Sequence, residues 1–182
     1  MQRPHDNCYW VIPGRLMAGE YPFAIREEDG REKLASIVAA GISHFIDLTH
    51  PRDPLDRYVG MLAEVTKAES MPGYDRFPID DMGVPDSPDQ VNAILDHLDL
   101  LLAENRVPYV HCWGGIGRTG TIVGCWLVRH GQSGEEALDT IAGHWATVAK
   151  RHRYPMSPQT EAQCDYVLNW DQHDRRRRMG HQ

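Results

Sequence analysis

The sequence predicts an α/β fold in which a central, mixed but mostly parallel sheet is flanked by helices. Apolar residues recur with helical spacing in some segments and form short continuous runs in others, and the two kinds of segment alternate along the chain. The 182 residues, 41% of them hydrophobic, suffice for one core but are few for two. We therefore expect a single domain over residues 1–182, with a short polar N-terminus and an Arg-rich tail from about 174 to 182.

The first half of the chain alternates strands with helices. A short strand pair is expected over residues 10–19, around a turn at Pro13-Gly14. The pattern then predicts a helix over 31–40, a buried strand over 42–48 that ends in a Pro-rich loop, a helix over 56–69 and a core strand over 74–79.

The second half begins with the clearest helix, which starts near Ser87-Pro88 and carries one apolar stripe. The stripe consists of Val91, Ile94, Leu95, Leu98, Leu101 and Leu102. A strand is expected over 108–111, followed by helices after Gly120, from Glu135 and from Ser157-Pro158. The run 175–178 is expected to be a solvated helix end, with an electrostatic contact to a partner as the alternative.

Charge and composition exclude several classes of protein. The net charge of −7 argues against nucleic-acid binding, which needs clustered cations. The chain contains no apolar run long enough to cross a membrane, and its polar N-terminus does not resemble a signal peptide. Cys8, Cys112, Cys125 and Cys164 form no C-x-x-C pair and are typical of a reducing compartment. We expect a cytoplasmic protein, monomeric, with no membrane or nucleic-acid partner.

The chemistry is expected in the loop between the strand at 108–111 and the next helix. Three glycines lie among the five residues between Cys112 and Arg118, so the backbone can curl and point successive N–H groups inward. Such a nest at a helix N-terminus binds a phosphate dianion, and its dipoles favour the thiolate form of a cysteine at its floor. Cys112 is thus the candidate nucleophile. Arg118 can bond two phosphoryl oxygens at once, and Thr119 can offer its hydroxyl to the thiolate.

Other interpretations of this loop explain fewer residues. A structural buried cysteine beside a glycine turn leaves Arg118 and the glycines without a role. Gly115, Gly117 and Gly120 formally fit a dinucleotide fingerprint, but no acidic residue ends a second strand about 20 residues later. A phosphate-binding adaptor without catalysis and a redox-sensing thiol, with Cys125 or Cys8 as resolving partner, remain as alternatives.

The stretch H-C-W-G-G-I-G-R-T-G resembles the signature loop of the protein tyrosine and dual-specificity phosphatases, and the chain resembles their small atypical members. Residues 10–19 and 45–49 resemble the same proteins. The resemblance implies a phosphotyrosine protein phosphatase-like fold and hydrolysis of phosphomonoesters through a phosphocysteine intermediate. It implies that a phosphoprotein or aryl phosphate substrate binds to the loop residues Trp113, Gly114, Gly115, Ile116, Gly117 and Arg118.

The general acid is expected on the segment 77–86, which resembles the acid loop of these phosphatases. The resemblance aligns Asp81 with the acid, and Asp80 and Asp86 remain as alternatives. Asp86 together with Ser87 is favoured as the cap of the helix at Pro88.

Gln159 and Gln163 resemble the glutamine that positions the hydrolytic water, although the same segment is also typical of a helix start. His111 is expected to orient the Cys112 loop rather than to act as a base. No metal or other cofactor is expected, because the His and Cys residues lack ligand spacing. Lipid phosphatases of the superfamily that this chain resembles carry lysines inside the loop. Because this loop carries Trp113 and Ile116 and the chain is acidic, we expect a phosphoprotein or aryl phosphate substrate rather than an inositol phosphate.

Overall fold

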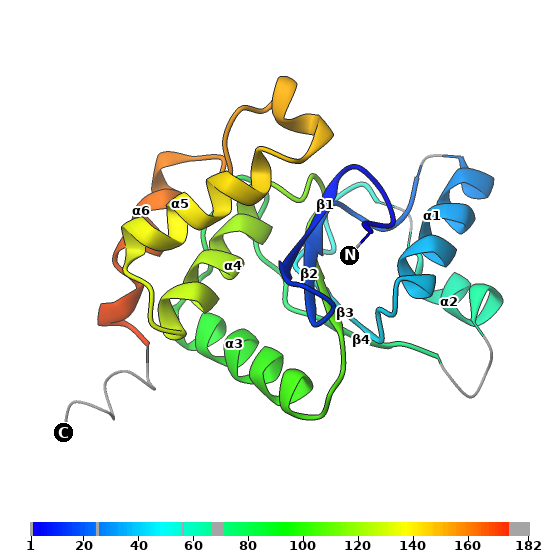
Figure 1. Ribbon diagram of the computed structural model, residues 1–182, viewed down its shortest axis with the longest axis horizontal. Helices are drawn as coiled ribbons and strands as arrows, with labels where there is room; N and C mark the ends of the chain where they lie inside the picture. The colour runs from blue at the N-terminus through cyan, green and yellow to red at the C-terminus, as the bar shows by residue number, and fades with distance from the viewer. Residues whose placement is uncertain (1, 25, 56, 67–70, 175–182) are drawn as a thin grey trace.

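The computed structural model describes residues 2–24, 26–55, 57–66 and 71–174, and its centre is a five-stranded sheet (Figure 1). The strands are β1 (Cys8–Ile12), β2 (Leu16–Gly19), β3 (His44–Asp47), β4 (Gly73–Arg76) and β5 (Pro108–His111). Their order is β1-β2-β5-β3-β4, and only the β1–β2 pair is antiparallel. The expected mixed, mostly parallel sheet is confirmed.

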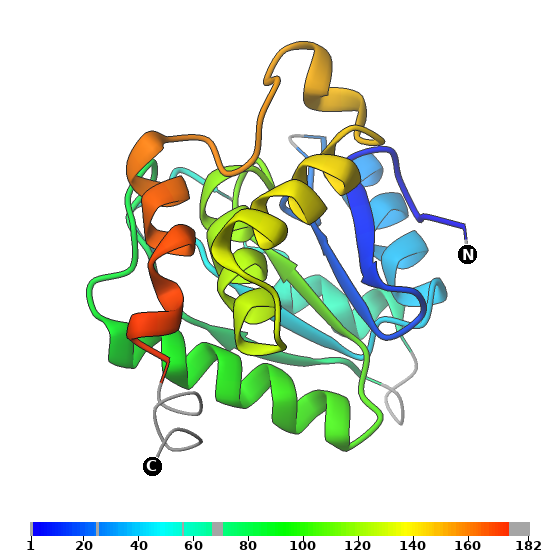
Figure 2. The same ribbon diagram turned by 60° about the vertical axis from the view of Figure 1, so that its left-hand side comes forward.

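Helices cover both faces of this sheet (Figures 1 and 2). One face packs against α1 (Glu27–Ala39) and α2 (Val59–Val65), and an apolar cluster around Phe45 and Tyr109 fills the space between. The other face is covered by α3 (Pro88–Ala103), α4 (Gly117–Arg129), α5 (Gly134–Trp145) and α6 (Glu161–Leu168). Two short 3₁₀ helices, Ala149–His152 and Trp170–Gln172, complete the described elements.

Helix α4 occupies the middle of the second layer and begins earlier than the sequence indicated. All of its residues are buried, and it packs against α3, α5 and α6. It starts at Gly117 instead of after Gly120, with Ile116 as the N-cap residue. Arg118 and Thr119 therefore lie in its first turn, where the backbone N–H groups have no partner within the helix.

Helix α6, in contrast, begins later than expected, at Glu161 instead of at Ser157-Pro158. Thr160 is its N-cap, and Thr160 and Gln163 form a reciprocal capping box. The hydroxyl of Ser157 donates instead to the carbonyl of Ile116 in the loop after β5 (2.7 Å). The expected tail at 174–182 lies outside the described residues except for Asp174, as do positions 56 and 67–69 of the helix expected over 56–69.

The topology brings three loops to one edge of the sheet. Strands β2, β5, β3 and β4 run parallel, so their carboxyl ends share this edge. The loop after β5 carries Cys112 and leads into α4. The loops after β3 and β4 carry Asp53 and Asp81. In an open α/β sheet, this edge is where ligands bind.

Candidate active site

The loop between β5 and α4 turns its carbonyl groups outward. The carbonyl of Trp113 accepts from the N–H of Tyr21 (2.9 Å), that of Gly114 from Lys150 Nζ (3.4 Å) and that of Ile116 from Ser157 Oγ (2.7 Å). In a trans peptide the C=O and the following N–H point in opposite directions. The amides of Gly114, Gly115 and Gly117 therefore face the inside of the loop, as an anion nest requires.

Gly115 makes this curl possible. Its φ of 72° lies in the left-handed region, and a Cβ atom there would be 2.4 Å from the carbonyl carbon of Gly19. No larger residue fits between the loop and the end of β2 without moving the backbone. Because its Cα faces β2, Gly115 can offer a ligand only its amide.

Cys112 and Arg118 line one small cavity at the floor of this loop. The cavity has a volume of about 20 Å³ and is also lined by Asp81, Met82, Gly114, Ile116, Gly117 and Gln159. Cys112 is 3% exposed. Burial opposes the charge on Arg118, but Cys112 and the nearby carboxylates outweigh it, so the pKa of the guanidinium is raised. A permanent cation and the sulfur of Cys112 thus share the site.

Arg118 is held by the two loops that face it. Its Nη1 donates to Asp53 Oδ2 (2.6 Å) and to the carbonyl of Ile79 (3.0 Å), and its Nη2 donates to Asp81 Oδ1 (2.8 Å). The side chain of Asp53 is 8% exposed and that of Asp81 is 51% exposed. The Asp81 carboxylate therefore occupies a donor of Arg118 that a phosphoryl oxygen would need.

The three candidate acids lie in different surroundings. Only Asp81 lines the cavity with Cys112. Asp80 is paired with the exposed Arg52 (2.8 Å). Ser87 alone caps α3 with its side chain, while the N–H of Asp86 donates to Gln90 Oε1 (2.8 Å). The geometry favours Asp81.

Comparison with known proteins agrees with this arrangement. Residues 5–167 match the family model PTP-SAK, the DSP-PTPase phosphatase domain described as a Swiss Army Knife protein. The chain belongs to this family. The resemblance to dual-specificity phosphatases is confirmed, and the chain is a phosphatase domain of the protein tyrosine and dual-specificity type.

One relative is named for both a lipid and a protein substrate. Over 146 residues the domain is 34% identical to the phosphatidylinositol 3,4,5-trisphosphate 3-phosphatase and protein-tyrosine-phosphatase PTEN1 of Arabidopsis thaliana. The match covers 79% of this chain but only 34% of PTEN1, so the chain spans about a third of that relative's length.

Two solved structures share the fold. Kinase-associated phosphatase, with its catalytic-site cysteine replaced by serine, superposes with a TM-score of 0.67 at 19% identity, covering 94% of this chain and 97% of that one. PTPMT1 in complex with PI(5)P superposes with a TM-score of 0.65 at 17% identity, covering 92% and 96%. The expected phosphatase-like fold is confirmed.

The two glutamines differ in their position relative to the cavity of this phosphatase domain. Gln159 lines it. Gln163 is fully buried behind Gly117, where Oε1 accepts from the N–H groups of Gln159 and Thr160 and Nε2 donates to the carbonyl of Gly83 (2.8 Å). The structure therefore places Gln159 at the site and makes Gln163 a bridge between α6 and the acid loop.

His111 and Thr119 lie beneath the loop. His111 is fully buried, its Nε2 is 2.7 Å from the hydroxyl of Tyr58, and burial lowers its pKa to about 4. A ring that stays neutral at pH 7 orients its neighbours and does not supply charge.

The buried hydroxyl of Thr119 has no hydrogen-bond partner among the described residues. That donor is consistent with a role toward a thiolate.

Trp113 lies outside the small cavity. It is 42% exposed and lines the wider mouth above, a hollow of about 210 Å³ that also includes Lys150, Tyr154 and Gln159. Lys150 is a cation that the loop sequence itself does not contain. It approaches the loop because the segment after α5 folds back over it.

Besides Lys150, Asp53 is a site residue that sequence reasoning missed. It contacts Arg118 across a separation of 65 residues. Its only sequence signal is a carboxylate in the Pro-rich loop after a core strand, a position at the ligand-binding edge of such a sheet.

The two cysteines considered as redox partners are poorly suited to react. Cys8 and Cys125 are fully buried, and burial raises the pKa of Cys8 to about 11 and that of Cys125 well above its usual range. Both remain thiols at neutral pH, and the thiolate is the reactive form.

One group of side chains has the composition of a metal site, but it lies at the other end of the sheet. Asp75 Oδ2 is 2.7 Å from His44 Nε2 and 2.9 Å from His97 Nε2. It is the one such group found among the described residues. His44 begins β3, whereas the cavity lies at the carboxyl ends of the strands, so this group takes no part in the site at Cys112.

Proposed function

We propose that Cys112 carries the phosphoryl group of a phosphoprotein substrate in a two-step hydrolysis, with Asp81 as acid and then base. The observation that carries this assignment is the shared cavity of Cys112, Arg118 and Asp81 beneath inward-facing amides.

In the first step the Cys112 thiolate attacks phosphorus in line with the ester oxygen. The P–O bond breaks, its electron pair stays on the leaving oxygen, and Asp81 supplies the proton. Arg118 and the amides of the loop bind the equatorial oxygens, whose charge spreads in the transition state.

In the second step water attacks the phosphocysteine. Asp81 takes a proton from that water, the S–P bond breaks and Cys112 leaves as a thiolate. We assign the orientation of this water to Gln159, which lines the cavity. Arg118 keeps the same contacts with the oxygens in both steps.

Substrate entry requires one rearrangement. A cavity of about 20 Å³ has room for about one water molecule and none for a phosphoryl group. The half-exposed Asp81 must therefore leave Nη2 of Arg118, and the incoming oxygen takes its place. Once released, the carboxyl group is free to turn toward the leaving oxygen.

A phosphorylated protein is the substrate class that the mouth supports. Trp113 and Tyr154 flank the entrance with aromatic surface, and the loop itself contains no lysine. Four free thiols, of which one must stay reduced to react, favour the reducing cytoplasm as the compartment. None of the described helices has the length and apolarity to span a bilayer.

The test is turnover of p-nitrophenyl phosphate and of a phosphotyrosine peptide by wild type, Cys112→Ser and Cys164→Ser. We expect Cys112→Ser to lose about 10⁴-fold or more in kcat. The matched control is Cys164→Ser, which changes a partly exposed thiol outside the cavity and should retain full activity. Turnover by Cys112→Ser near the wild-type rate would refute the assignment.

A further inference from the structure

A second and larger hollow adjoins the mouth of the active site on the other side of Trp113. Its volume is about 450 Å³, within the usual range for binding pockets. Trp113 and Lys150 line both this hollow and the mouth. A bound polypeptide whose phosphoryl group lies over Cys112 would pass Trp113 and enter this hollow. We call the hollow the Trp113 pocket.

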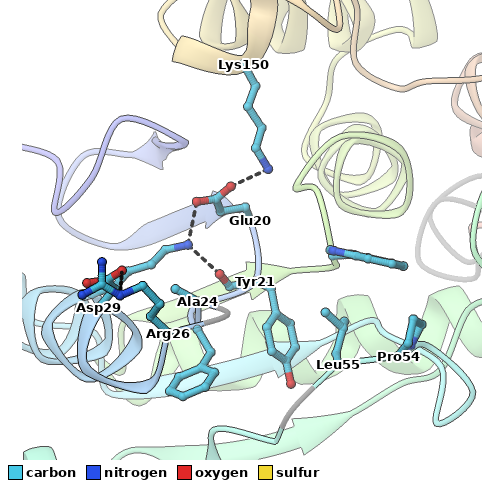
Figure 3. A pocket seen from close by; sticks show the side chains of 11 residues that line it. Glu20, Tyr21, Ala24, Arg26, Asp29, Pro54, Leu55 and Lys150 are labelled. Atoms are coloured by element: carbon cyan, nitrogen blue, oxygen red, sulfur yellow. Dashed lines mark hydrogen bonds and ion pairs between the residues drawn. The ribbon is translucent and has the colours of Figure 1, made fainter.

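One wall of the Trp113 pocket is apolar. Tyr21, Pro54 and Leu55 form it (Figure 3), and Phe23 and Trp113 add further apolar lining to the pocket. These residues come from the segment after β2, the loop after β3 and the catalytic loop, so three separate segments converge on it. Apolar and aromatic side chains in a concave setting, with one exposed aromatic ring at Trp113, are typical of binding sites, because covering such surface supplies much of the binding energy.

The opposite side is a chain of three charged groups. Glu20 accepts from Lys33 Nζ (2.6 Å) through Oε1 and pairs with Lys150 through Oε2 (Figure 3). Burial opposes ionisation of Glu20, but the two lysines outweigh it and lower its pKa. The side chains of Glu20 and Lys33 are only 15% and 16% exposed, so the group is fixed within the fold.

This group carries one positive charge in excess, since two ammonium groups face one carboxylate. Arg26 and Asp29 at the rim pair with each other and cancel. An ammonium has three N–H donors, and the described contacts use two of them on each lysine. Besides Glu20, Lys33 contacts the carbonyl of Tyr21 (2.7 Å) and Lys150 contacts the carbonyl of Gly114 (3.4 Å). The remaining donors suit one carboxylate better than a cluster of phosphates.

From these observations we propose that the Trp113 pocket binds the peptide segment next to the phosphorylated residue of a protein substrate, with an apolar side chain against Leu55 and Trp113 and an acidic side chain at Lys33 and Lys150. The inference rests on the phosphatase function proposed above and adds sequence selectivity to it. The Trp113 pocket would thus add contacts for protein substrates that a phosphomonoester too small to pass Trp113 does not make.

The experiment compares two classes of substrate on matched variants. The probes are p-nitrophenyl phosphate and phosphotyrosine peptides that carry one leucine and one glutamate at varied positions flanking the phosphotyrosine, together with versions in which these become alanine and glutamine. The variants are Leu55→Ala and Lys33→Gln. Leu100→Ala, an exposed leucine on α3, and Arg151→Ala, an exposed cation outside the pocket, are the controls.

For at least one leucine–glutamate peptide, we expect the kcat/KM of the wild type to be about tenfold higher than for the matching alanine–glutamine peptide. Leu55→Ala and Lys33→Gln should abolish that preference, each losing about tenfold more on this peptide than on p-nitrophenyl phosphate. The two controls should behave as wild type on both probes. Lys33→Arg should restore the preference if Lys33→Gln lowers it through lost charge.

Two results would overturn the inference while leaving the phosphatase function intact. One is equal turnover of all peptides by a wild type that hydrolyses p-nitrophenyl phosphate. The other is preference for a short-chain phosphatidylinositol 5-phosphate that Lys33→Gln abolishes, since the occupant would then be an inositol phosphate. Absence of p-nitrophenyl phosphate turnover would instead refute the proposed function itself.

Discussion

The two loops that meet over Cys112 are built in opposite ways. The loop from Cys112 into α4 is largely buried apart from the exposed Trp113, and its carbonyl groups are bonded to three other segments. The acid loop exposes half of Asp81 and half of Met82, and Met82 adopts a φ of 60° that costs a non-glycine residue about 1 kcal/mol. The loop at Cys112 is thus held by several segments. Across from it, Asp81 and Met82, which we propose move on substrate entry, are half exposed, while Gln163 anchors the same loop at Gly83.

The comparison depends first on Arg118, the residue that both loops share. Arg118→Lys keeps the positive charge but loses the fork that reaches Asp53 and two phosphoryl oxygens. We expect kcat/KM for a phosphotyrosine peptide to fall about 10³-fold. Steady-state kinetics measure this, and a loss below about fivefold would show that charge alone suffices.

Removing the movable acid should separate catalysis from binding. In Asp81→Ala we expect kcat for a phosphopeptide to fall about 10²-fold, because the leaving oxygen loses its proton donor. Tungstate, a phosphate mimic, should bind severalfold more tightly, since no carboxylate competes for Nη2 of Arg118.

Calorimetric titration of tungstate checks the second outcome. The control is Asp80→Ala, which removes the neighbouring carboxylate that is paired with Arg52 in the wild type. It should change neither kcat for the phosphopeptide nor the affinity for tungstate much. Weaker tungstate binding by Asp81→Ala would contradict the displacement of Asp81 by substrate.

The preformed loop can be tested through its stability. Gly115→Ala combines a left-handed φ with a clash against the end of β2, so we expect a loss of about 3 kcal/mol in the free energy of unfolding. Gly41→Ala is the matched control, because Gly41 has a φ of 95° but no atom within 4 Å of the added Cβ. It should lose about 1 kcal/mol. Equal losses in urea denaturation would show that the approach to β2 is not tight.

The smallest effect is expected at Asp53, which positions Arg118 through Nη1. Asp53→Asn keeps an acceptor but removes the charge, and we expect kcat to fall about tenfold with KM nearly unchanged. Asp53→Glu should recover part of the loss if the carboxylate orients the guanidinium. An increase in KM alone would indicate that Asp53 contacts the substrate instead.

Local patterns in the sequence were enough to predict the sheet, the helices around it and the loop at Cys112. Strand, glycine-rich turn and helix follow one another within a few residues there, so no distant contact is needed to recognise the nest. The start of α4 was placed too late, because glycines weaken a helix signal even where burial against Gln163 and Ser157 supports the first turn.

The residues that the sequence did not reveal are joined to the site by distant contacts. Asp53 reaches Arg118 only because β3 and β5 are neighbours in the sheet. Lys150 arrives from a segment that folds back after α5. Which of Gln159 and Gln163 lines the cavity depends on where α6 begins. Thr160 and Gln163 form the capping box at that point, and the sequence pattern of such a box is common to many helix starts.

A crystal structure of the Cys112→Ser variant with a phosphotyrosine peptide tests the central assignment most directly. We expect the phosphoryl oxygens on the loop amides and on Arg118, with Asp81 withdrawn from Nη2 and turned toward the ester oxygen. A phosphoryl group bound away from this loop, or an Asp81 still paired with Arg118 beside a bound peptide, would contradict the account.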